Sequence, residues 1–562
     1  MASTRRKKIS LSGIALMREP LLNKGTAFTA EERKAFGLDG LLPYRSVTIE
    51  EQARRVYERL SHKADPLEKH VALAALHDRN ECLYFYLLRK YLEQLLPIVY
   101  TPTVGLATMR FSHVFQRGRG VWLTPDLAGS IAQTLRRAAG NRDIRLIVIT
   151  DNESILGLGD QGAGGIAISI GKLAIYTAAA GIDPATVLPV SLDVGTENQD
   201  LLDDPMYLGW PSRRVRGAEY EALLDEFVAA VKSEFPEALV QWEDFRKDNA
   251  LRVMDRYRDE VLSFNDDIEG TGAVALAGLL CAGRVHGRPL AEERVVIVGA
   301  GAAGLGVFRQ LRAALQATGL RGDKLRQAIA VLDSRGLVVD DGHLVDAYKQ
   351  EFAWTPAIAE HWNLAGADRG LQRVCDAYRP TVLIGTSGQH AIFNESVVRS
   401  VAAAVDRPVI LPMSNPTAQS EAVPDDILTW TAGRALIAAG SPFDDAHFGG
   451  RRFRVGQANN AFIFPGLGLG VLLSGVRRIT DRMFLVAGEA LAASVTDDEL
   501  KSGLLFPPVC RLCEVSVAVA RAVMHDAVQT GIAESLHEDE IEMRLATGMW
   551  SPEYPDFGPV SG

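Results

Sequence analysis

The stretch RVVIVGAGAAGLG (residues 294–306) decides the fold class of this chain. Its run of apolar residues predicts a buried strand, and the glycine loop that follows leads into a helical pattern, LGVFRQLRAAL. Gly299, Gly301 and Gly304 have the G-x-G-x-x-G spacing, which permits a tight turn and close approach of backbone N–H groups to a pyrophosphate. The alternative is a glycine turn that only shapes the backbone. The strand, loop and helix in this order favour a dinucleotide-binding site.

The next predicted strand, AIAVLDSRG (328–336), ends in an acidic residue, Asp333. An acid at this position binds the ribose diol of NAD. Ser334 and Arg335 follow it directly and Lys349 lies downstream, where a cation could pair with the 2′-phosphate of NADP. Such charge-assisted hydrogen bonds contribute about 1.5–3 kcal/mol each. We therefore expect NADP as the preferred cofactor. The alternative cofactor is NAD, and under that hypothesis Arg335 and Lys349 are only solvated surface charges.

Other segments repeat the pattern of an apolar strand that ends in small polar residues. TVLIGTSG (381–388) and PVILPMSN (408–415) are strand candidates downstream of the glycine loop. RLIVIT (145–150) and TVLPVSLDVG (186–195) form an earlier set, separated by the helical pattern IAISIGKLAIYTAAAG (166–181). Strands that alternate with helices predict parallel sheets, so the fold class is α/β.

Composition and charge limit the class of protein. The 562-residue chain is long enough for two or more domains, and its net charge of −10 argues against a nucleic-acid partner. Five cysteines favour a reducing compartment, and we expect Cys510 and Cys513 to be buried on a helix rather than to bind zinc. No uninterrupted apolar run is long enough for a bilayer, and the basic N-terminus is typical of a solvated arm. We expect a cytoplasmic protein without a membrane partner.

A cluster of acidic residues raises the question of a metal ion. In FNDDIEGTGA (264–273), Asp266 and Asp267 precede an apolar helical pattern. Acids suit the start of a helix, so helix capping is the simplest role. A second adjacent pair, Glu243 and Asp244, follows an apolar strand candidate. Four carboxylates brought together would repel one another unless a divalent cation lay among them. Oxygen ligands without nearby His or Cys favour Mg²⁺ or Mn²⁺ over zinc.

Blocks along the chain resemble malic enzymes. They lie in the order typical of that family, between about residues 20 and 480, and are YTPTVG (100–105), ILGLGDQGAGGIAISIGKLAIYTAAAGI (155–182), LDVGT (192–196), EDF (243–245), FNDDIEGTGAV (264–274), MSNPT (413–417) and GQANNAFIFPG (456–466). The resemblance implies oxidative decarboxylation of L-malate to pyruvate and CO₂, with reduction of NAD(P) and a requirement for Mg²⁺ or Mn²⁺.

The same resemblance implies roles for individual residues. The expected metal ligands are Glu243, Asp244 and Asp267, the acid–base groups are Tyr100, Lys172 and Asp266, and the amides that bind malate are Asn415, Asn459 and Asn460, with Asn415 also at the cofactor. Lys172 is expected to take the C2 hydroxyl proton and Tyr100 to protonate C3 of the enolate. Considered singly, Lys172 fits a solvated helix lysine, Tyr100 a core aromatic and the asparagines turn formers.

Two positions depart from the family pattern. Ser154 stands in TDNESILG where many malic enzymes carry an arginine that binds a malate carboxylate. Loss of such a contact costs about 2–3 kcal/mol unless another cation replaces it. Malolactic enzymes, which convert malate to lactate and CO₂ without releasing NADH, also lack the arginine at this position. A malolactic activity is therefore the alternative function. A metabolite sensor without catalysis is a third hypothesis.

The second departure is Glu269, where the family usually has glutamine.

The resemblance also sets the expected organisation. We expect an N-terminal arm and an all-helical domain (1–118), a substrate-binding α/β domain with a parallel sheet (119–265 with 460–535), a Rossmann-type NAD(P)-binding domain (266–459) and a C-terminal tail (536–562) that wraps or dangles. The family implies a homodimer or homotetramer. Arg55 and Arg79 fall where some members bind an activating dicarboxylate.

Overall fold

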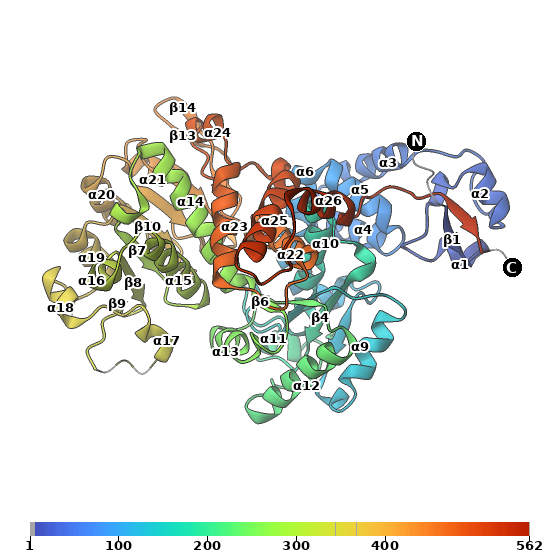
Figure 1. The fold of residues 1–562 in the computed structure, drawn as a ribbon, viewed down its shortest axis with the longest axis horizontal. Helices are drawn as coiled ribbons and strands as arrows, with labels where there is room; N and C mark the ends of the chain where they lie inside the picture. Colours follow the sequence, from blue (N-terminus) through green and yellow to red (C-terminus); the bar gives the residue numbers. More distant parts are fainter. Residues whose placement is uncertain (1–5, 343, 345, 367, 561–562) are drawn as a thin grey trace. The chain divides into compact units, whose positions relative to one another are not determined.

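The protein is described by a computed structural model covering residues 6–342, 344, 346–366 and 368–560. The chain forms two compact units (Figure 1). The first comprises Met1–Asn152, Asp160–Ala238 and Ala546–Gly562, and the second comprises Glu153–Gly159 and Leu239–Leu545. The α/β fold class is confirmed. The finer division into four domains stays a prediction.

The helical pattern near the N-terminus is confirmed in the first unit. Its helices are α3 (Ile49–Ser61), α4 (Pro66–His77), α5 (Glu81–Lys90), α6 (Leu92–Val99) and α7 (Thr103–Met109). A capping box starts α3, because the Thr48 hydroxyl accepts from the Glu51 N–H and the Glu51 carboxylate accepts from the Thr48 N–H. Apolar side chains such as Leu73, Leu87 and Leu96 are buried between these helices.

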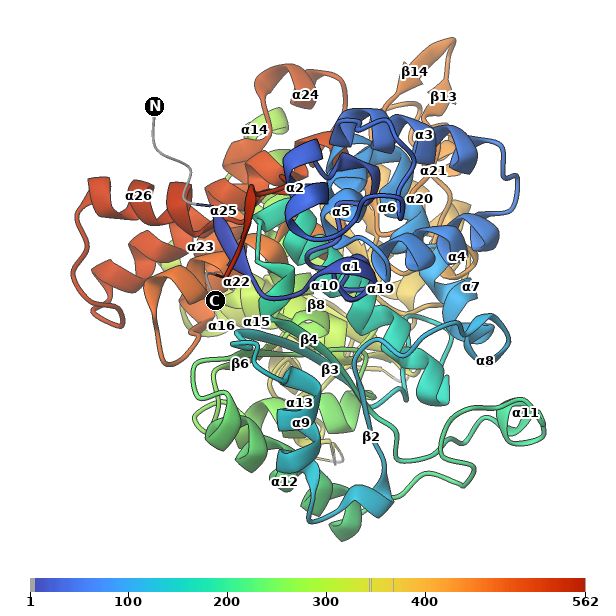
Figure 2. The same ribbon diagram turned by 90° about the vertical axis from the view of Figure 1, so that its right-hand side faces the viewer.

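The helical character of the N-terminal region is confirmed, and one short strand in the arm before the helices adds to it. Strand β1 (Lys7–Ile9) pairs in parallel with β16 (Phe557–Pro559) at the other end of the chain (Figure 2). The Phe557 N–H donates to the Glu32 carboxylate at 2.9 Å, and Phe557 packs in a small apolar core with Phe28. The C-terminal tail is therefore tied into the first unit by backbone pairing and by burial of an aromatic side chain.

The first unit also contains the earlier set of predicted strands. Strand β4 (Val187–Leu192) pairs in parallel with β2 (Val121–Leu123) on one side and β3 (Leu146–Thr150) on the other. Helix α10 (Ile166–Ala180) packs against β3 and β4 and ends at Gly181, whose φ of +64° is the left-handed conformation that glycine favours. Helices α9 (Ile131–Ala139) and α12 (Ala218–Glu234) pack against each other.

The second unit is built on a seven-stranded sheet, with strand order β15-β12-β11-β10-β7-β8-β9. The strands are β15 (Gly456–Gln457), β12 (Leu436–Ala439), β11 (Val409–Pro412), β10 (Val382–Gly385), β7 (Val295–Val298), β8 (Ile329–Asp333) and β9 (Gly336–Leu337). All neighbouring pairs are parallel except β8 and β9. This order, with the chain starting at the centre and reversing direction across the sheet, is that of a Rossmann-type domain.

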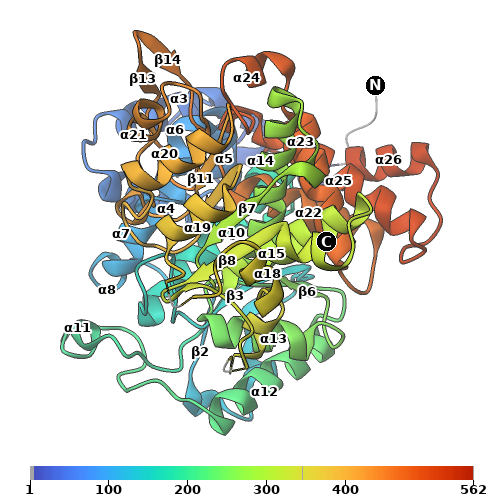
Figure 3. The same ribbon diagram turned by 90° about the vertical axis from the view of Figure 1, so that its left-hand side faces the viewer.

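Helices cover both faces of this sheet. On one face, α18 (Pro356–His361), α19 (Leu371–Tyr378), α20 (Glu395–Ala404) and α21 (Pro424–Trp430) share one buried core with the strands (Figure 3). On the other face, α15 (Ala302–Ala317) contacts β7 and β8, and α14 (Thr271–His286) packs on α15. Further helices, α22 (Phe464–Ser474), α23 (Asp481–Ser494) and α25 (Leu512–Gln529), extend the layer from α14. Apolar strands therefore have no solvent-exposed face, as parallel sheets require.

Two helical stretches are long and apolar enough to cross a bilayer, Gly162–Ala180 and Asp266–His286. Within the protein, 89% and 67% of their most apolar windows are buried. The first stretch packs against β3 and β4 and the second against α15 and α23, and this burial accounts for their apolar composition.

The cysteine pair differs from expectation. Cys510 is exposed in a short 3₁₀ turn and Cys513 is only half-buried at the start of α25, so the expected burial of both is wrong. The prediction placed both residues on a helix, whereas Cys510 lies in the turn that precedes the helix. All five cysteines lie within the described residues, and none of them forms a disulfide.

Candidate active site

Three acidic side chains of the second unit meet at one point. Glu243, Asp244 and Asp267 each offer a carboxylate oxygen, and these oxygens lie within 4.8 Å of one another. Glu243 and Asp244 are buried and Asp267 is partly exposed. Among the described residues this is the single group of three or more potential metal ligands. Three carboxylates at this spacing form an oxygen-only donor set, which suits a hard divalent cation.

The register of two strands explains why distant acids converge. Strand β5 (Leu239–Trp242) pairs in parallel with β6 (Ser263–Asn265), and Trp242 lies opposite Asn265. The next residue of each strand is acidic, Glu243 after β5 and Asp266 after β6. When two parallel strands end in register, the residues that follow them lie at the same edge of the sheet.

The backbone at the second acid is unusual and is held in place by its neighbours. Asp244 has a φ of +56°, which is rare for a residue with a side chain and is often found at functional sites. Its N–H donates to the Asp267 carboxylate at 2.7 Å, and its carbonyl accepts from the Ser154 N–H at 3.1 Å. Ser154, the departure from the family arginine, therefore lies directly beside the backbone of a candidate metal ligand.

Asp266 is buried and is packed over a glycine. Its carboxylate accepts from the Asn460 amide at 3.2 Å, and the same amide donates to the Asp266 carbonyl. A Cβ atom on Gly270 would lie 2.0 Å from the Asp266 Oδ1 atom, so this position leaves no room for a side chain. Asp266 and Asn460, both predicted from the sequence, are thus in direct contact, whereas Asn459 uses its side chain to cap the turn at Ala461.

The helix-capping role falls to a different residue from the two aspartates. The Asn265 side chain accepts from the Ile268 N–H and caps the single π-helical turn Asp266–Gly270 that leads into α14. Glu269 accepts from the Asn265 N–H and from Arg258. Burial raises the pKa of Glu269 to about 7, against the opposing effect of Arg258.

The two remaining predicted acid–base groups lie in the first unit. Lys172, on α10, is 1% exposed, and its Nζ atom lies 5.5 Å from the centre of the Tyr100 ring. Tyr100 follows the end of α6 and is also buried. Gly171 permits this approach, because a Cβ atom there would lie 3.0 Å from the Val99 carbonyl oxygen. Lys172 is therefore not the solvated helix lysine of the simpler hypothesis.

The glycine loop of the second unit has the geometry that its sequence predicts. Gly299 follows β7 with a φ of +122°, and a Cβ atom on Gly304 would lie 1.8 Å from the Gly299 carbonyl oxygen. A Cβ atom on Gly301 would contact nothing within 4 Å, so the start of α15 presents open backbone. Gly306 brings α15 against the acidic segment, since its Cβ would lie 1.9 Å from the Ile268 carbonyl oxygen.

Asp333, at the end of β8, pairs with Lys349, one of the two cationic residues on which the NADP expectation rested. Lys349 Nζ lies 2.5 Å from the Asp333 carboxylate, whereas the Arg335 side chain is 78% exposed and 3.7 Å away. Ser334 is exposed. Although burial opposes it, hydrogen bonds from Lys349 and the Arg335 N–H lower the pKa of Asp333 below its ordinary value. The carboxylate is thus kept ionised and its partner lysine is occupied.

A buried glutamate orders the loops after β10 and β11. The Glu421 carboxylate accepts from the Ser387 N–H at 2.8 Å and from the Ser414 hydroxyl at 2.6 Å. Asn415, predicted to contact malate and cofactor, follows Ser414 and is half-buried. The sequence analysis missed Glu421 because this residue lies outside the quoted blocks. Its position as a lone acid a few residues after MSNPT is a signal that could have identified it.

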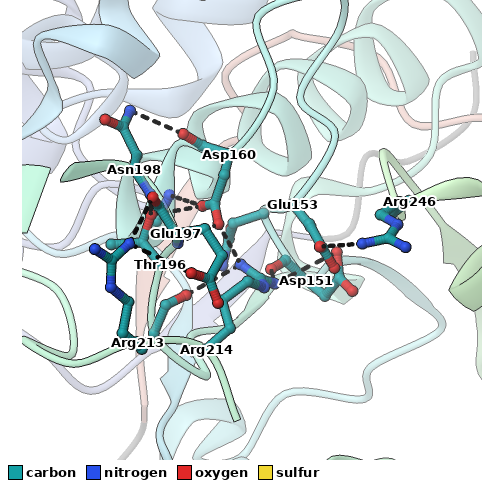
Figure 4. Close-up of polar contacts among 12 residues, drawn as sticks. Asp151, Glu153, Asp160, Thr196, Glu197, Asn198, Arg213, Arg214 and Arg246 are labelled. Atoms are coloured by element: carbon teal, nitrogen blue, oxygen red, sulfur yellow. Dashed lines mark hydrogen bonds and ion pairs between the residues drawn. The ribbon is translucent and has the colours of Figure 1, made fainter. Parts of the chain in front are cut away.

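A second missed network lies in the first unit, at the loops after β3 and β4 (Figure 4). The Asp160 carboxylate accepts from the Thr196 hydroxyl at 2.8 Å and from Arg214 at 3.2 Å. Arg214 is almost fully buried and also donates to the Gly195 carbonyl at 3.0 Å. Asp160 belongs to the ILGLGD block, so this network fixes the end of that block to the LDVGT block.

Comparisons with known proteins agree with this architecture. A family profile described as "Malic enzyme, N-terminal domain" matches residues 77–258, and one described as "Malic enzyme, NAD binding domain" matches residues 268–528. The chain is 42% identical to the "NAD-dependent malic enzyme" of Psychromonas ingrahamii, over 98% of each chain. It is 45% identical to "NAD-dependent malic enzyme 3" of Bacillus subtilis, over 97% of this chain and 96% of that one. The malic enzyme of Entamoeba histolytica shares the fold, with a TM-score of 0.54, 19% identity and coverage of 93% of each chain.

The fold and the family profiles define an oxidoreductase with an NAD-binding Rossmann-type domain. The chain belongs to the malic enzyme family.

We expect Asp267→Asn to weaken Mn²⁺ binding at least 10-fold, because it removes one of three negative charges while still accepting from the Asp244 N–H. Electron paramagnetic resonance titration of free Mn²⁺ measures this affinity. Asp259→Asn, at an exposed carboxylate outside the cluster, is the matched control and should bind Mn²⁺ like the unmodified protein. Equal affinity in both variants would contradict a metal role for the three acids.

Proposed function

We propose that this chain catalyses the oxidative decarboxylation of L-malate to pyruvate and CO₂ with reduction of NAD. The observation that carries the proposal is the cluster of three carboxylates in a chain of the malic enzyme family. A cluster of like charges within 4.8 Å is unfavourable by itself and suits a chain that binds a divalent cation.

In this proposal Glu243, Asp244 and Asp267 hold Mg²⁺ or Mn²⁺. Their donor set fits such an ion, since all three offer oxygen and none offers sulfur or nitrogen. When bound, the cation polarises the substrate oxygens and stabilises the negative charge that develops as CO₂ leaves. Gln241 orients one ligand, because its amide donates to the Glu243 carboxylate at 2.7 Å. Asp266, oriented by Asn460, assists proton transfer beside the ligands.

Lys172 and Tyr100 supply the two proton transfers of the reaction. Neutral Lys172 accepts the proton of the C2 hydroxyl while the C2 hydride passes to the nicotinamide. After CO₂ leaves, Tyr100 donates a proton to C3 of the enolate. The assignment is supported by the position of Lys172, which is buried with its Nζ atom 5.5 Å from the centre of the Tyr100 ring.

We propose NAD rather than NADP as the preferred cofactor. The NADP expectation rested on Arg335 and Lys349, yet Lys349 is paired with Asp333 and Arg335 extends into solvent. An ionised Asp333 accepts hydrogen bonds from a ribose diol and repels a 2′-phosphate. The matching relatives are named NAD-dependent, which is consistent with this choice.

A malolactic activity is the second candidate function, and Ser154 is the observation that favours it. The serine leaves a malate carboxylate without the arginine found in many malic enzymes.

We propose that Arg246 takes the place of the missing arginine. Its half-exposed guanidinium lies 3.4 Å from the carboxylate of Glu153, the residue before Ser154 (Figure 4). Asn415 and Asn459 remain proposed malate contacts.

We propose a cytoplasmic location, which is consistent with five cysteines that form no disulfide among the described residues. We also propose a homodimer or homotetramer, as the family resemblance implies.

The first expected outcome concerns the products. With L-malate, NAD and Mn²⁺, we expect NADH and pyruvate to form in equal amounts and EDTA to abolish turnover, because the cation is required for CO₂ loss. Absorbance at the NADH band and chromatography of pyruvate and lactate measure this. Lactate without net NADH would establish the malolactic function instead, and no product of either kind would leave only a metabolite sensor.

The second expected outcome separates the two proton transfers. Lys172→Ala should lower malate oxidation about 100-fold or more but retain tautomerisation of added enolpyruvate, whereas Tyr100→Phe should do the reverse. Stopped-flow absorbance follows each partial reaction. Lys232→Ala, at an exposed lysine of α12, is the matched control. A normal rate of malate oxidation in Lys172→Ala, or of tautomerisation in Tyr100→Phe, would refute that half of the assignment.

The third expected outcome concerns cofactor choice. Asp333→Ala removes the ribose acceptor and releases Lys349, so the ratio of kcat/KM for NAD to that for NADP should fall by at least about 10-fold. Steady-state kinetics with both cofactors measure the ratio. Asp340→Ala, at an exposed acid after β9, should leave it unchanged. If the unmodified protein prefers NADP, the proposed NAD preference is wrong.

A further inference from the structure

A cavity of about 1200 Å³ in the second unit has a strongly basic lining. The antiparallel hairpin of β13 (Ala446–Phe448) and β14 (Arg451–Phe453) borders it together with α24 (Asp497–Lys501), and both project from the same end of the unit (Figure 3). Its cationic residues are Arg284, Arg407, Arg451, Arg452, Arg454 and Lys501. Asp497 is the one acidic residue in the described lining.

Half of these cations are neutralised locally. Arg284 pairs with Asp497 at 2.9 Å, Lys501 pairs with Asp498 at 3.0 Å, and Arg452 pairs with Asp445. These three side chains therefore have structural partners that reduce their attraction for a ligand.

The other three are not neutralised. Within the described part of the chain, the side chains of Arg407, Arg451 and Arg454 form no ion pair and no hydrogen bond. Arg451 instead lies over the Phe453 ring, with 5.5 Å from its guanidinium carbon to the ring centre. Unpaired guanidinium groups around a concave surface focus a positive potential and attract anions. The chain as a whole carries a net charge of −10, so this accumulation is not a consequence of overall composition.

The lining also indicates the size and chemistry of the ligand. Guanidinium groups form paired hydrogen bonds with phosphate oxygens, and several of them suit more than one phosphate. The cavity is larger than the 300–1000 Å³ that is typical of small-molecule sites. Leu428, Phe453 and Val455 add apolar surface to the lining, which fits a base or other apolar group attached to the phosphates.

We propose that this cavity binds an anion with several contiguous phosphates, held by Arg407, Arg451 and Arg454. A nucleoside triphosphate and an inorganic polyphosphate share this chemistry, and only the first would use the apolar part of the lining. The site is distinct from the proposed cofactor and metal positions, since its lining includes neither the glycine loop nor the three carboxylates. The proposal therefore stands independently of malate turnover.

The test is calorimetric titration of the full chain with ATP and, separately, with tripolyphosphate. Saturating NADH keeps the cofactor position filled, and the absence of divalent cations prevents chelation. We expect saturable binding of both anions that weakens as salt rises. The double variant Arg451→Ala/Arg454→Ala should bind at least 10-fold more weakly, because each charge-assisted contact contributes about that factor.

The matched control is Arg477→Ala/Arg478→Ala. These adjacent exposed arginines belong to the same unit and lie outside the cavity, so the variant removes the same charge. Its affinity should equal that of the unmodified chain, and thermal melting should show both variants folded.

Each outcome decides the proposal. Tighter binding of ATP than of tripolyphosphate supports a nucleotide ligand, and equal binding supports a phosphate-only ligand. Absence of binding at millimolar concentration would overturn the proposal, as would equal weakening in both double variants. If neither anion binds and sedimentation velocity shows that only the cavity variant changes its oligomeric state, the arginines form an interface between copies instead.

Discussion

Mutual repulsion among three clustered carboxylates is the constraint on which the candidate site depends. Glu243, Asp244 and Asp267 are held within 4.8 Å, an arrangement that three like charges would not adopt without being forced. The force comes from the backbone. The in-register end of β5 and β6 brings the two acidic segments together, and the hydrogen bond from the Asp244 N–H to the Asp267 carboxylate offsets part of the repulsion. A preformed arrangement of this kind would lower the entropy cost of binding the proposed cation.

The same constraint links the acidic segment to the nucleotide-binding sheet. Gly306 lets α15 approach the Ile268 carbonyl, and Gly304 lets the start of α15 approach the Gly299 carbonyl after β7. Helix α15 therefore touches the acidic turn on one side and the glycine loop on the other without an intervening side chain. Close packing of this kind resists deformation, so the distance between the two loops is set by helix packing. Hydride transfer requires such a fixed distance between cofactor and substrate.

The elements that carry local patterns could be predicted from the sequence, whereas contacts between distant polar residues could not. Runs of apolar residues predict the strand before Gly299 and the helix that contains Lys172. Glu421 and Arg214 have no periodic or motif signal, because their importance comes from loops that fold towards them. The NADP expectation failed to anticipate Lys349 pairing with Asp333 for the same reason, since sequence order does not show which acid a lysine meets.

Acidic and basic side chains are concentrated in separate places of the second unit, the three carboxylates in one and the basic cavity in the other. The sequence GGRRFR places Arg451, Arg452 and Arg454 on one short hairpin, but Arg284 and Arg407 join them only in the fold. The two groups share no residue, because the three carboxylates do not border the basic cavity. Cations gathered around a concave surface concentrate a positive potential there even though the chain as a whole carries a net charge of −10. Binding of a polyanion in the cavity, as proposed, would therefore not use any of the proposed metal ligands.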